Sequence, residues 1–338
     1  MMIMTDERVR AVRWRDLRDL TRSETVGELL MPLPWLVLSL GLAQAGHYAL
    51  ALPASFMFFL TGLRQIHDSY HGTLGLARRG DDLVMLVQSL PMMSAMHAVK
   101  INHLRHHRLC MAEGDVEAAS ARMSAVGAIA FGPLFPFLLL REALRSGPRR
   151  DRRWVKIELG AIALWVALVF GVLEWDALRY HVLAMCVGEC FTAFFCVWTV
   201  HHGCDRAHFI ARTSRRQLWN MVFYDMFFHV EHHLFAGVPT RHLHRLAARL
   251  DEAAPELRGK DVWVFEDVFS RPSRYGVDTS SGADGRVKHR LSSRAKRGIL
   301  APTFGPVPTA KGKIPRCARD DSGACTAIGA NFGDVSTP

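Results

Sequence analysis

The chain has 338 residues, of which 49% are hydrophobic and 22% are charged, and its formal net charge is +10. Its mean hydropathy of +0.07 is high for a soluble protein with so many charged residues, so charge and apolarity must be segregated along the chain. Lys and Arg beside long apolar stretches are typical of the cytosolic flanks of membrane helices. This pattern favours a membrane protein, and we expect no nucleic-acid partner.

The cysteines and the N-terminus indicate a reducing, non-secretory setting. There are seven cysteines, an odd number, and Cys186, Cys190 and Cys196 lie inside one apolar stretch, so no disulfide framework is implied. The first 24 residues are charged and lack an apolar core followed by a small-residue cleavage site. We therefore expect no secretory signal peptide.

Four apolar stretches approach the length of about 20 residues that a helix needs to cross the hydrocarbon. They run over residues 29–45, 48–66, 157–173 and 178–200. Only short segments separate the first stretch from the second and the third from the fourth. The sequence therefore predicts two membrane-spanning helical hairpins.

Two further apolar stretches, 83–99 and 123–140, are predicted to be interfacial or re-entrant. The reason is the Arg-rich segment 141–156, which the positive-inside rule places in the cytosol. A spanning helix over 123–140 would move that segment to the opposite side. Residues 67–156, and everything after residue 200, are thus expected on the cytosolic side.

The expected fold is all-α and polytopic, with about four transmembrane helices in two hairpins, interfacial helices and a cytosolic helical cap. We divide the chain into a cytosolic N-terminal segment (1–28), a membrane domain (29–268) and a basic tail (269–338). The tail is rich in Ser, Gly, Arg, Lys, Pro and Thr without apolar periodicity, and we expect it to be disordered.

Eight of the 17 histidines fall into three short motifs. On an α-helix, residues i, i+3 and i+4 share a face, so each motif directs its imidazoles toward one point. One such motif alone is often surface decoration, but three beside predicted membrane boundaries indicate a metal site. The motifs are HDSYH (His67, His71), HLRHH (His103, His106, His107) and HVEHH (His229, His232, His233).

The number and type of these side chains bear on the metal. Imidazole suits Zn, Fe, Cu and Ni, but a zinc site normally needs only three or four ligands. Eight or more imidazoles without a nearby thiolate are enough for two metals with open positions. Two Fe ions that react with O2 fit such a set, and copper stays open on ligand type alone.

In this order, HDSYHG, HLRHH and HVEHHLFAGVP resemble the three histidine boxes of membrane fatty acid desaturases and their hydroxylase and ketolase relatives. The resemblance covers residues 50–250 and includes the connecting segment GDDLVMLVQSLPM. It implies a di-iron enzyme that uses O2 and two external electrons to desaturate a fatty acyl or related lipid chain. Lipid hydroxylation, and carotenoid ketolation or hydroxylation, are the alternatives within the superfamily. A zinc-dependent membrane hydrolase is the competing class.

The resemblance also implies a ligand set. In the family, one more histidine before the third box commonly completes the set; His202 looks most like that position, and His201 is the second choice. The implied ligands are His67, His71, His103, His106, His107, His202, His229, His232 and His233.

Other polar residues have expected roles around this site. Asp68 and Glu231, each inside a box, are expected to orient ligand imidazoles by hydrogen bonds. Glu189 lies inside a predicted span, where a carboxylate is costly, and it is a candidate for lining a substrate channel or for bonding a neighbouring helix. Three other histidines are expected at the surface: His97, His242 and His244.

The expected partners follow from the implied reaction. The chain has no Cys run for an iron–sulfur cluster and no GxGxxG fingerprint, so a separate electron donor of the ferredoxin, rubredoxin or cytochrome b5 type is expected. The basic segment 141–156 would suit an acidic carrier, and anionic lipid would use the same charges. We expect an integral protein of a bacterial-type inner membrane, with a membrane lipid as substrate and the active site on the cytosolic side.

Overall fold

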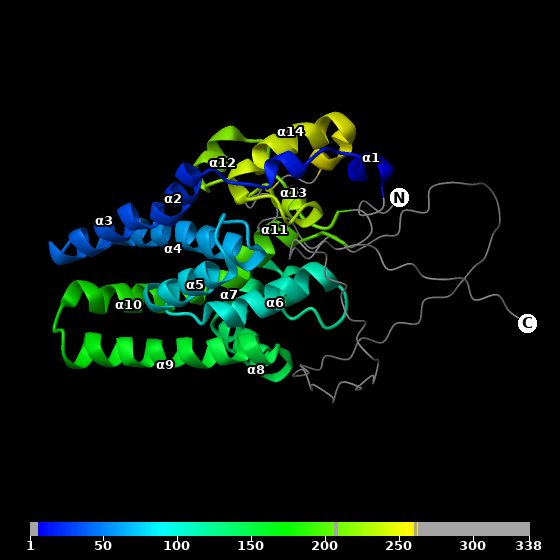
Figure 1. Ribbon diagram of the computed structural model, residues 1–338. Coiled ribbons are helices and arrows are strands. Elements are labelled where there is room, and N and C mark those ends of the chain that lie inside the picture. The colour runs from blue at the N-terminus through cyan, green and yellow to red at the C-terminus, as the bar shows by residue number, and fades with distance from the viewer. Residues whose placement is uncertain (1–5, 206–208, 260–261, 263–338) are drawn as a thin grey trace, which may run out of the picture. The chain divides into compact units, whose positions relative to one another are not determined.

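Two hairpins of long apolar helices form the centre of the computed structural model (Figure 1). The first consists of α3 (Leu33–Gln44) and α4 (Tyr48–His71), and the second of α9 (Arg149–Gly171) and α10 (Asp176–Glu189). Gly46 makes the first turn with φ of 79°, a conformation that costs glycine little. Ala43, Ala51 and Ala177 pack in one buried cluster, so both turns lie at the same end of the bundle.

The structure describes residues 6–205, 209–259 and 262, and within these ranges it is helical with no β-strand. The predicted all-α class is confirmed. The tail predicted for residues 269–338 lies outside the described residues.

Four helical segments are long and apolar enough to cross a membrane, which confirms the expected number: Arg22–Gln44, Tyr48–His71, Ala125–Ser146 and Arg149–Gly171. Their membership differs from the prediction in two respects. Ala125–Ser146, which is among the four, covers the stretch 123–140 that was predicted to be interfacial or re-entrant. The stretch predicted over 178–200 is a pair of helical segments, Asp176–Glu189 and Ala193–His201, with a 43° bend between them. Counting bent pairs as single spans raises the number to six.

The predicted interfacial stretch 83–99 falls on a sharp corner. Here α5 (Arg78–Met92) and α6 (Met96–Leu109) meet at 114°, as in a broken span or a re-entrant loop. Met93 ends α5 with φ of 57°, a left-handed conformation that stops the helix. The corner turns α6 toward the end of α4.

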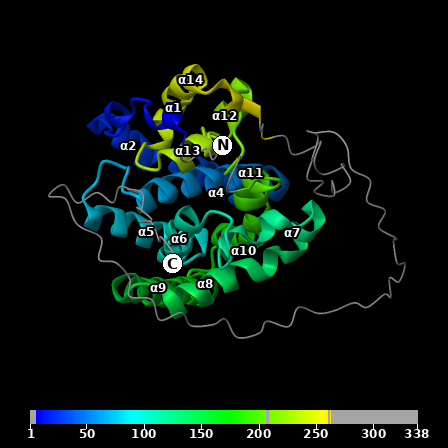
Figure 2. The same cartoon turned by 90° about the vertical axis from the view of Figure 1, so that its right-hand side faces the viewer.

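The second predicted interfacial stretch, 123–140, forms α7 (Ala125–Phe131), η4 (Gly132–Leu134) and α8 (Phe135–Ser146). Figure 2 shows α7 and α8 lying across the direction of the long helices. Val126 and Phe137 are more than half exposed, as expected where apolar side chains meet lipid. The interfacial position of this stretch remains a prediction.

The remaining helices gather at the end of the bundle opposite the two hairpin turns (Figure 1). They are α1 (Glu7–Arg10), α2 (Arg22–Leu30), α11 (Thr199–His201), α12 (Gln217–Val222), α13 (His229–Leu234) and α14 (Leu243–Ala253). Val9 and Leu17 share one apolar core with Val230, Leu246 and Leu250. Residues 9–17 therefore pack as part of the layer that carries the third histidine motif.

Candidate metal centre

The first motif occupies the last turns of α4. His67 and His71 are four residues apart and lie on one helix face, and their rings are 5.2 Å apart between centroids. Gly72 follows in the left-handed conformation with φ of 66° and ends the helix as a glycine C-cap. The helix thus runs five residues beyond the predicted apolar stretch 48–66 and carries both imidazoles past it.

The second motif lies on α6, beyond the corner at Met93. His103 and His107 are one turn apart, and their Nε2 atoms are 3.1 Å apart. His106 is rotated from them around the helix and has a different neighbour, the Nε2 atom of His201 at 3.1 Å. One helix therefore supplies ligand candidates to two places.

The third motif forms the short helix α13, whose imidazoles divide in the same way. The Nε2 atom of His232 lies 2.9 Å from that of His107. His229 lies 3.0 Å from His201, and His233 lies 3.2 Å from His229, again between Nε2 atoms.

Nine imidazoles therefore form two adjacent groups. The first group contains His67, His71, His103, His107 and His232. The second contains His106, His201 and His233, with His229 beside His201 and His233.

The structure brings His201 into this arrangement and leaves His202 outside it, which differs from the order of preference predicted from sequence. His202 stacks on Trp198 and its Nδ1 donates to the carbonyl oxygen of Ala121 at 3.0 Å. The cause is a π-helical turn, Ala193–Trp198 (η5), directly before α11. Such a wide turn shifts the facing of every later residue, and π turns are frequent at functional sites.

Asp115 and Glu117, in the loop after the second motif, orient two of the rings, and the sequence reasoning missed both. The Nδ1 atom of His106 donates to Asp115 at 2.8 Å, and that of His103 donates to Glu117 at 2.9 Å. Burial alone would raise the pKa of Asp115, but hydrogen bonds from His106 and two backbone N–H groups lower it below its ordinary value. The available signal was a pair of acids 8 and 10 residues after the last histidine of the box.

Asp68 and Glu231, predicted to orient imidazoles, have other partners. Asp68 accepts hydrogen bonds from the backbone N–H and the hydroxyl of Thr240, at 3.1 and 2.8 Å. Glu231 accepts from Thr213 at 2.7 Å and from Arg215 at 2.6 Å. Asp68 thus connects the first motif to the chain that follows the third, and Glu231 anchors α13 to the segment before it.

The ring nitrogens provide a test of whether a cation fits. His106 and His201 each donate Nδ1–H, to Asp115 and to the carbonyl of Ile210, so in the neutral rings each Nε2 carries only a lone pair. Two lone pairs facing each other at 3.1 Å form no hydrogen bond. A metal held at about 2.1 Å by each imidazole would separate two adjacent ligand atoms by about 3.0 Å. Both nitrogens of His67 are also buried without a partner, so the residues fit a metal-binding role.

Burial keeps the third motif in the form that binds metal. Burial is the largest cause that lowers the pKa of His229, His232 and His233 well below the ordinary value. Repulsion between neighbouring imidazoles lowers the pKa further. The rings are therefore neutral at physiological pH, as ligands must be.

His97, expected at the surface, is fully buried six residues before the second motif. Its Nδ1 lies 2.6 Å from Glu158, its Nε2 lies 3.1 Å from Asp82, and its ring stacks on Trp154. These groups tie α6 to α5 and α9. Burial between two carboxylates explains why the surface expectation is wrong.

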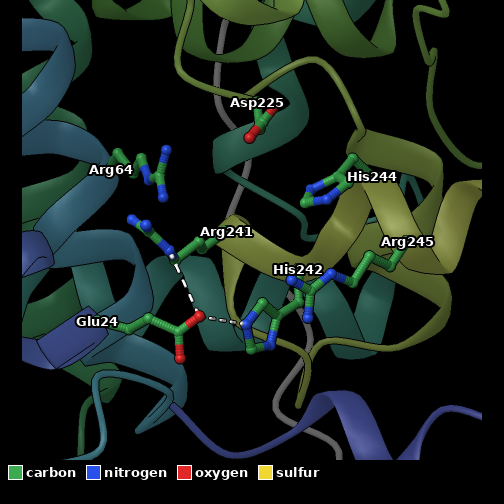
Figure 3. A pocket seen from close by; sticks show the side chains of 7 residues that line it. All are labelled: Glu24, Arg64, Asp225, Arg241, His242, His244 and Arg245. Atoms are coloured by element: carbon green, nitrogen blue, oxygen red, sulfur yellow. Dashed lines mark hydrogen bonds and ion pairs between the residues drawn. The ribbon is translucent and has the colours of Figure 1, made fainter. Parts of the chain in front are cut away.

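A polar cavity of about 360 Å³ lies next to the first motif, one helical turn before His67 on α4. Figure 3 shows Glu24 between Arg241 and His242, with Asp225 and His244 farther along the wall. His242 is buried and bonds the carbonyl of Leu17 at 2.8 Å and Glu24 at 3.2 Å, so the surface expectation fails here too.

Glu189, the candidate for a substrate channel, lies at the C-terminal end of α10 and hydrogen-bonds Ser94. This contact corresponds to the alternative of bonding a neighbouring segment. A channel role remains a prediction.

The fold and the site define a helical protein with several helices able to span a membrane and, at one end of its bundle, two groups of histidines that could hold metal ions. A family model described as fatty acid desaturase matches residues 35–264. The chain therefore belongs to the fatty acid desaturase family, a family of metal-dependent oxidoreductases that modify lipids. Searches of curated proteins and of solved structures give no match.

Proposed function

We propose that this protein is a membrane di-iron oxygenase that uses O2 and two external electrons to introduce a double bond into a fatty acyl or related lipid chain. The observation that carries the proposal is the pair of facing Nε2 atoms of His106 and His201, on rings whose Nδ1 atoms donate elsewhere, next to the first group of five imidazoles. Membership of the desaturase family supports the reaction class.

The proposed metal ligands are the nine imidazoles of the two groups, with His201 in place of His202. Five ligands for one iron and four for the other leave positions free for O2 in six-coordinate sites. When bound, iron would supply the redox chemistry that removes hydrogen from an unactivated C–H bond, which zinc cannot do. The overall balance is one lipid C–H pair, O2, two electrons and two protons converted to a C=C bond and two waters.

The protein's own groups would set the state of these ligands. Hydrogen bonds to Asp115, Glu117 and the carbonyl of Ile210 fix the proton on Nδ1 of three rings and leave Nε2 free. Most of the nine rings are buried, which limits the access of water to the site.

The partners and the location are part of the same proposal. Electrons come from a separate donor of the ferredoxin, rubredoxin or cytochrome b5 type, and the substrate is a membrane lipid. We place the metal centre on the cytosolic side of a bacterial-type inner membrane, because the Arg-rich start of α9 lies at the end opposite the hairpin turns.

A metal and lipid analysis tests the proposal. The purified protein should hold about two Fe per chain and consume O2 only with a reductant. Lipid extracts from cells that express it should gain species lighter by about two mass units. Gains of about sixteen units would indicate hydroxylation and about fourteen ketone formation. Stoichiometric Zn with native activity and no need for iron would overturn the proposal in favour of a hydrolase.

A further inference from the structure

A second cavity, of about 390 Å³, lies where α8 meets α9, and its charge has one sign. It is lined by Leu144, Arg149, Arg152, Arg153 and Lys156. No carboxylate lines it, and within the described residues none of these four cations forms an ion pair. Arg152 donates only to the carbonyl oxygen of Leu144, at 3.2 Å. The cavity is therefore suited to an anion.

The polar cavity of Figure 3 gives a contrast. There Glu24 and Asp225 lie among the basic side chains, and Glu24 already contacts Arg241 and His242. Its charges largely compensate one another. Of these two cavities in the described part of the chain, the one at α8 and α9 offers cations without internal counter-charges.

The four cations share one face of α9 because their spacing is three or four residues. The opposite face is fixed to the protein: Arg150 forms an ion pair with Asp82, and Glu158 holds His97. The first turns of α9 are thus anchored from behind. The backbone that carries the cationic face is therefore held in place before a ligand binds.

The same face of α9 becomes apolar toward the hairpin turn. Ile157, Leu164 and Leu168 follow Arg153 in steps of four, seven and four residues on the exposed side of the helix, and they are 51%, 62% and 38% exposed. A stripe of exposed apolar side chains on a helix that is long enough to span a membrane is a lipid-facing surface. The basic cavity lies at the end of this stripe.

We propose that the cavity is a binding site for one anionic phospholipid, with its phosphate among Arg149, Arg153 and Lys156 and an acyl chain along Ile157 and Leu164. Arginine and lysine at the membrane surface attract anionic headgroups, and the adjacent stripe gives the chain an apolar contact. An acidic protein carrier would match the charges but not the stripe. The site is separate from the metal centre, so the proposal goes beyond the proposed function.

Native mass spectrometry of the purified full chain in detergent tests the site, with phosphatidylglycerol and phosphatidylcholine of the same chain length as probes. The test variant is R149Q/R153Q/K156Q. The matched control, R18Q/R78Q/R79Q, removes the same charge at exposed arginines outside the cavity. We expect wild type and control to bind one phosphatidylglycerol at least tenfold more tightly than phosphatidylcholine, and the test variant to lose this preference.

Further controls test for misfolding of the variant and distinguish a bound lipid from a bound headgroup or acidic peptide. Arg153→Lys keeps the charge and should bind as wild type does. Glycerophosphoglycerol, the headgroup without chains, should not displace the lipid at equal concentration, and neither should an acidic peptide. Equal preference in test and control variants, or displacement by the free headgroup or by the peptide, would overturn the proposal.

Discussion

The Nε2 atoms of His106 and His201 lie 3.1 Å apart although each ring already donates its Nδ1 proton elsewhere. In the neutral rings, these two residues 95 positions apart face each other with lone pairs, an arrangement that a cation between them stabilises. Their partners Asp115 and Ile210 create this arrangement, and the loops that carry those partners are part of the site.

Replacement of His201 by Ala should remove one ligand from the second group, whereas replacement of His202 should not. We expect His201→Ala to lower the iron content from about two to about one per chain and to abolish turnover. His202→Ala is the matched control and should keep both, with at most a modest loss of stability from its contact with Trp198. Metal analysis and O2 uptake measure the difference; iron loss only in His202→Ala would reverse the assignment.

The Asp115→Asn variant should weaken metal binding without touching a ligand. The change preserves size but removes the negative charge that receives the Nδ1 proton of His106. Loss of such a partner typically lowers metal affinity 10- to 100-fold, by order of magnitude. Competition with a chelator would measure this, with Glu113→Asn, an exposed neighbour, as control. Equal affinities in the two variants would show that Asp115 does not tune the site.

Metal removal should destabilise the fold, because the facing imidazoles lose the cation that separates them. We expect the midpoint of thermal unfolding to fall after chelation and to recover on addition of Fe²⁺, since a ligand that binds only the folded state stabilises it. Differential scanning fluorimetry of the chelated and reloaded protein measures this shift. A midpoint unaffected by chelation would indicate that the histidine groups hold no structural metal.

Histidine spacing was sufficient to find eight of the nine imidazoles, because positions i, i+3 and i+4 must share a helix face. It was not sufficient to choose between His201 and His202. That choice depends on the π turn over Ala193–Trp198, and the local sequence CFTAFFCVW contains no pattern that predicts such a turn. One extra residue in a turn exchanges which of two adjacent histidines faces the site.

Apolar length predicted the hairpins because burial of the backbone in lipid requires about 20 apolar residues in a helix. Length alone did not predict the corner at Met93 or the place of His97. The partner Glu158 of His97 is 61 residues away in sequence, so its burial depends on tertiary packing of α6 against α9. The hydrogen-bond partner of Asp68 differed from the predicted imidazole for the same reason, since its partner Thr240 is 172 residues away in sequence.

The Thr240→Val variant tests the connection between the first and third motifs. The hydroxyl donates to the buried carboxylate of Asp68, and its loss leaves that acceptor with one partner fewer, at a cost of about 1–3 kcal/mol. Thr61→Val is the control, because the Thr61 hydroxyl bonds only carbonyls of its own helix. Denaturant unfolding should give a larger loss of unfolding free energy for Thr240→Val than for Thr61→Val. Equal losses would contradict a stabilising role of the Asp68–Thr240 contact.

Glu158→Gln should destabilise the anchor between α6 and α9. It removes one of the two carboxylate partners of His97 in a fully buried position and leaves Asp82, and loss of a partner costs about 3–5 kcal/mol in other buried pairs. Asp151→Asn, on the same helix and in a weaker contact with Arg150, should cost much less. The unfolding midpoints of the two variants measure this difference. Similar midpoints would show that the contact between His97 and Glu158 does not stabilise the fold.

The most direct test is anomalous X-ray diffraction from crystals of the iron-loaded protein, recorded at the iron edge. We predict two iron peaks, one surrounded by the imidazoles of His67, His71, His103, His107 and His232 and the other by those of His106, His201, His229 and His233. A single peak, peaks away from these rings, or a signal at the zinc edge alone would contradict the di-iron centre.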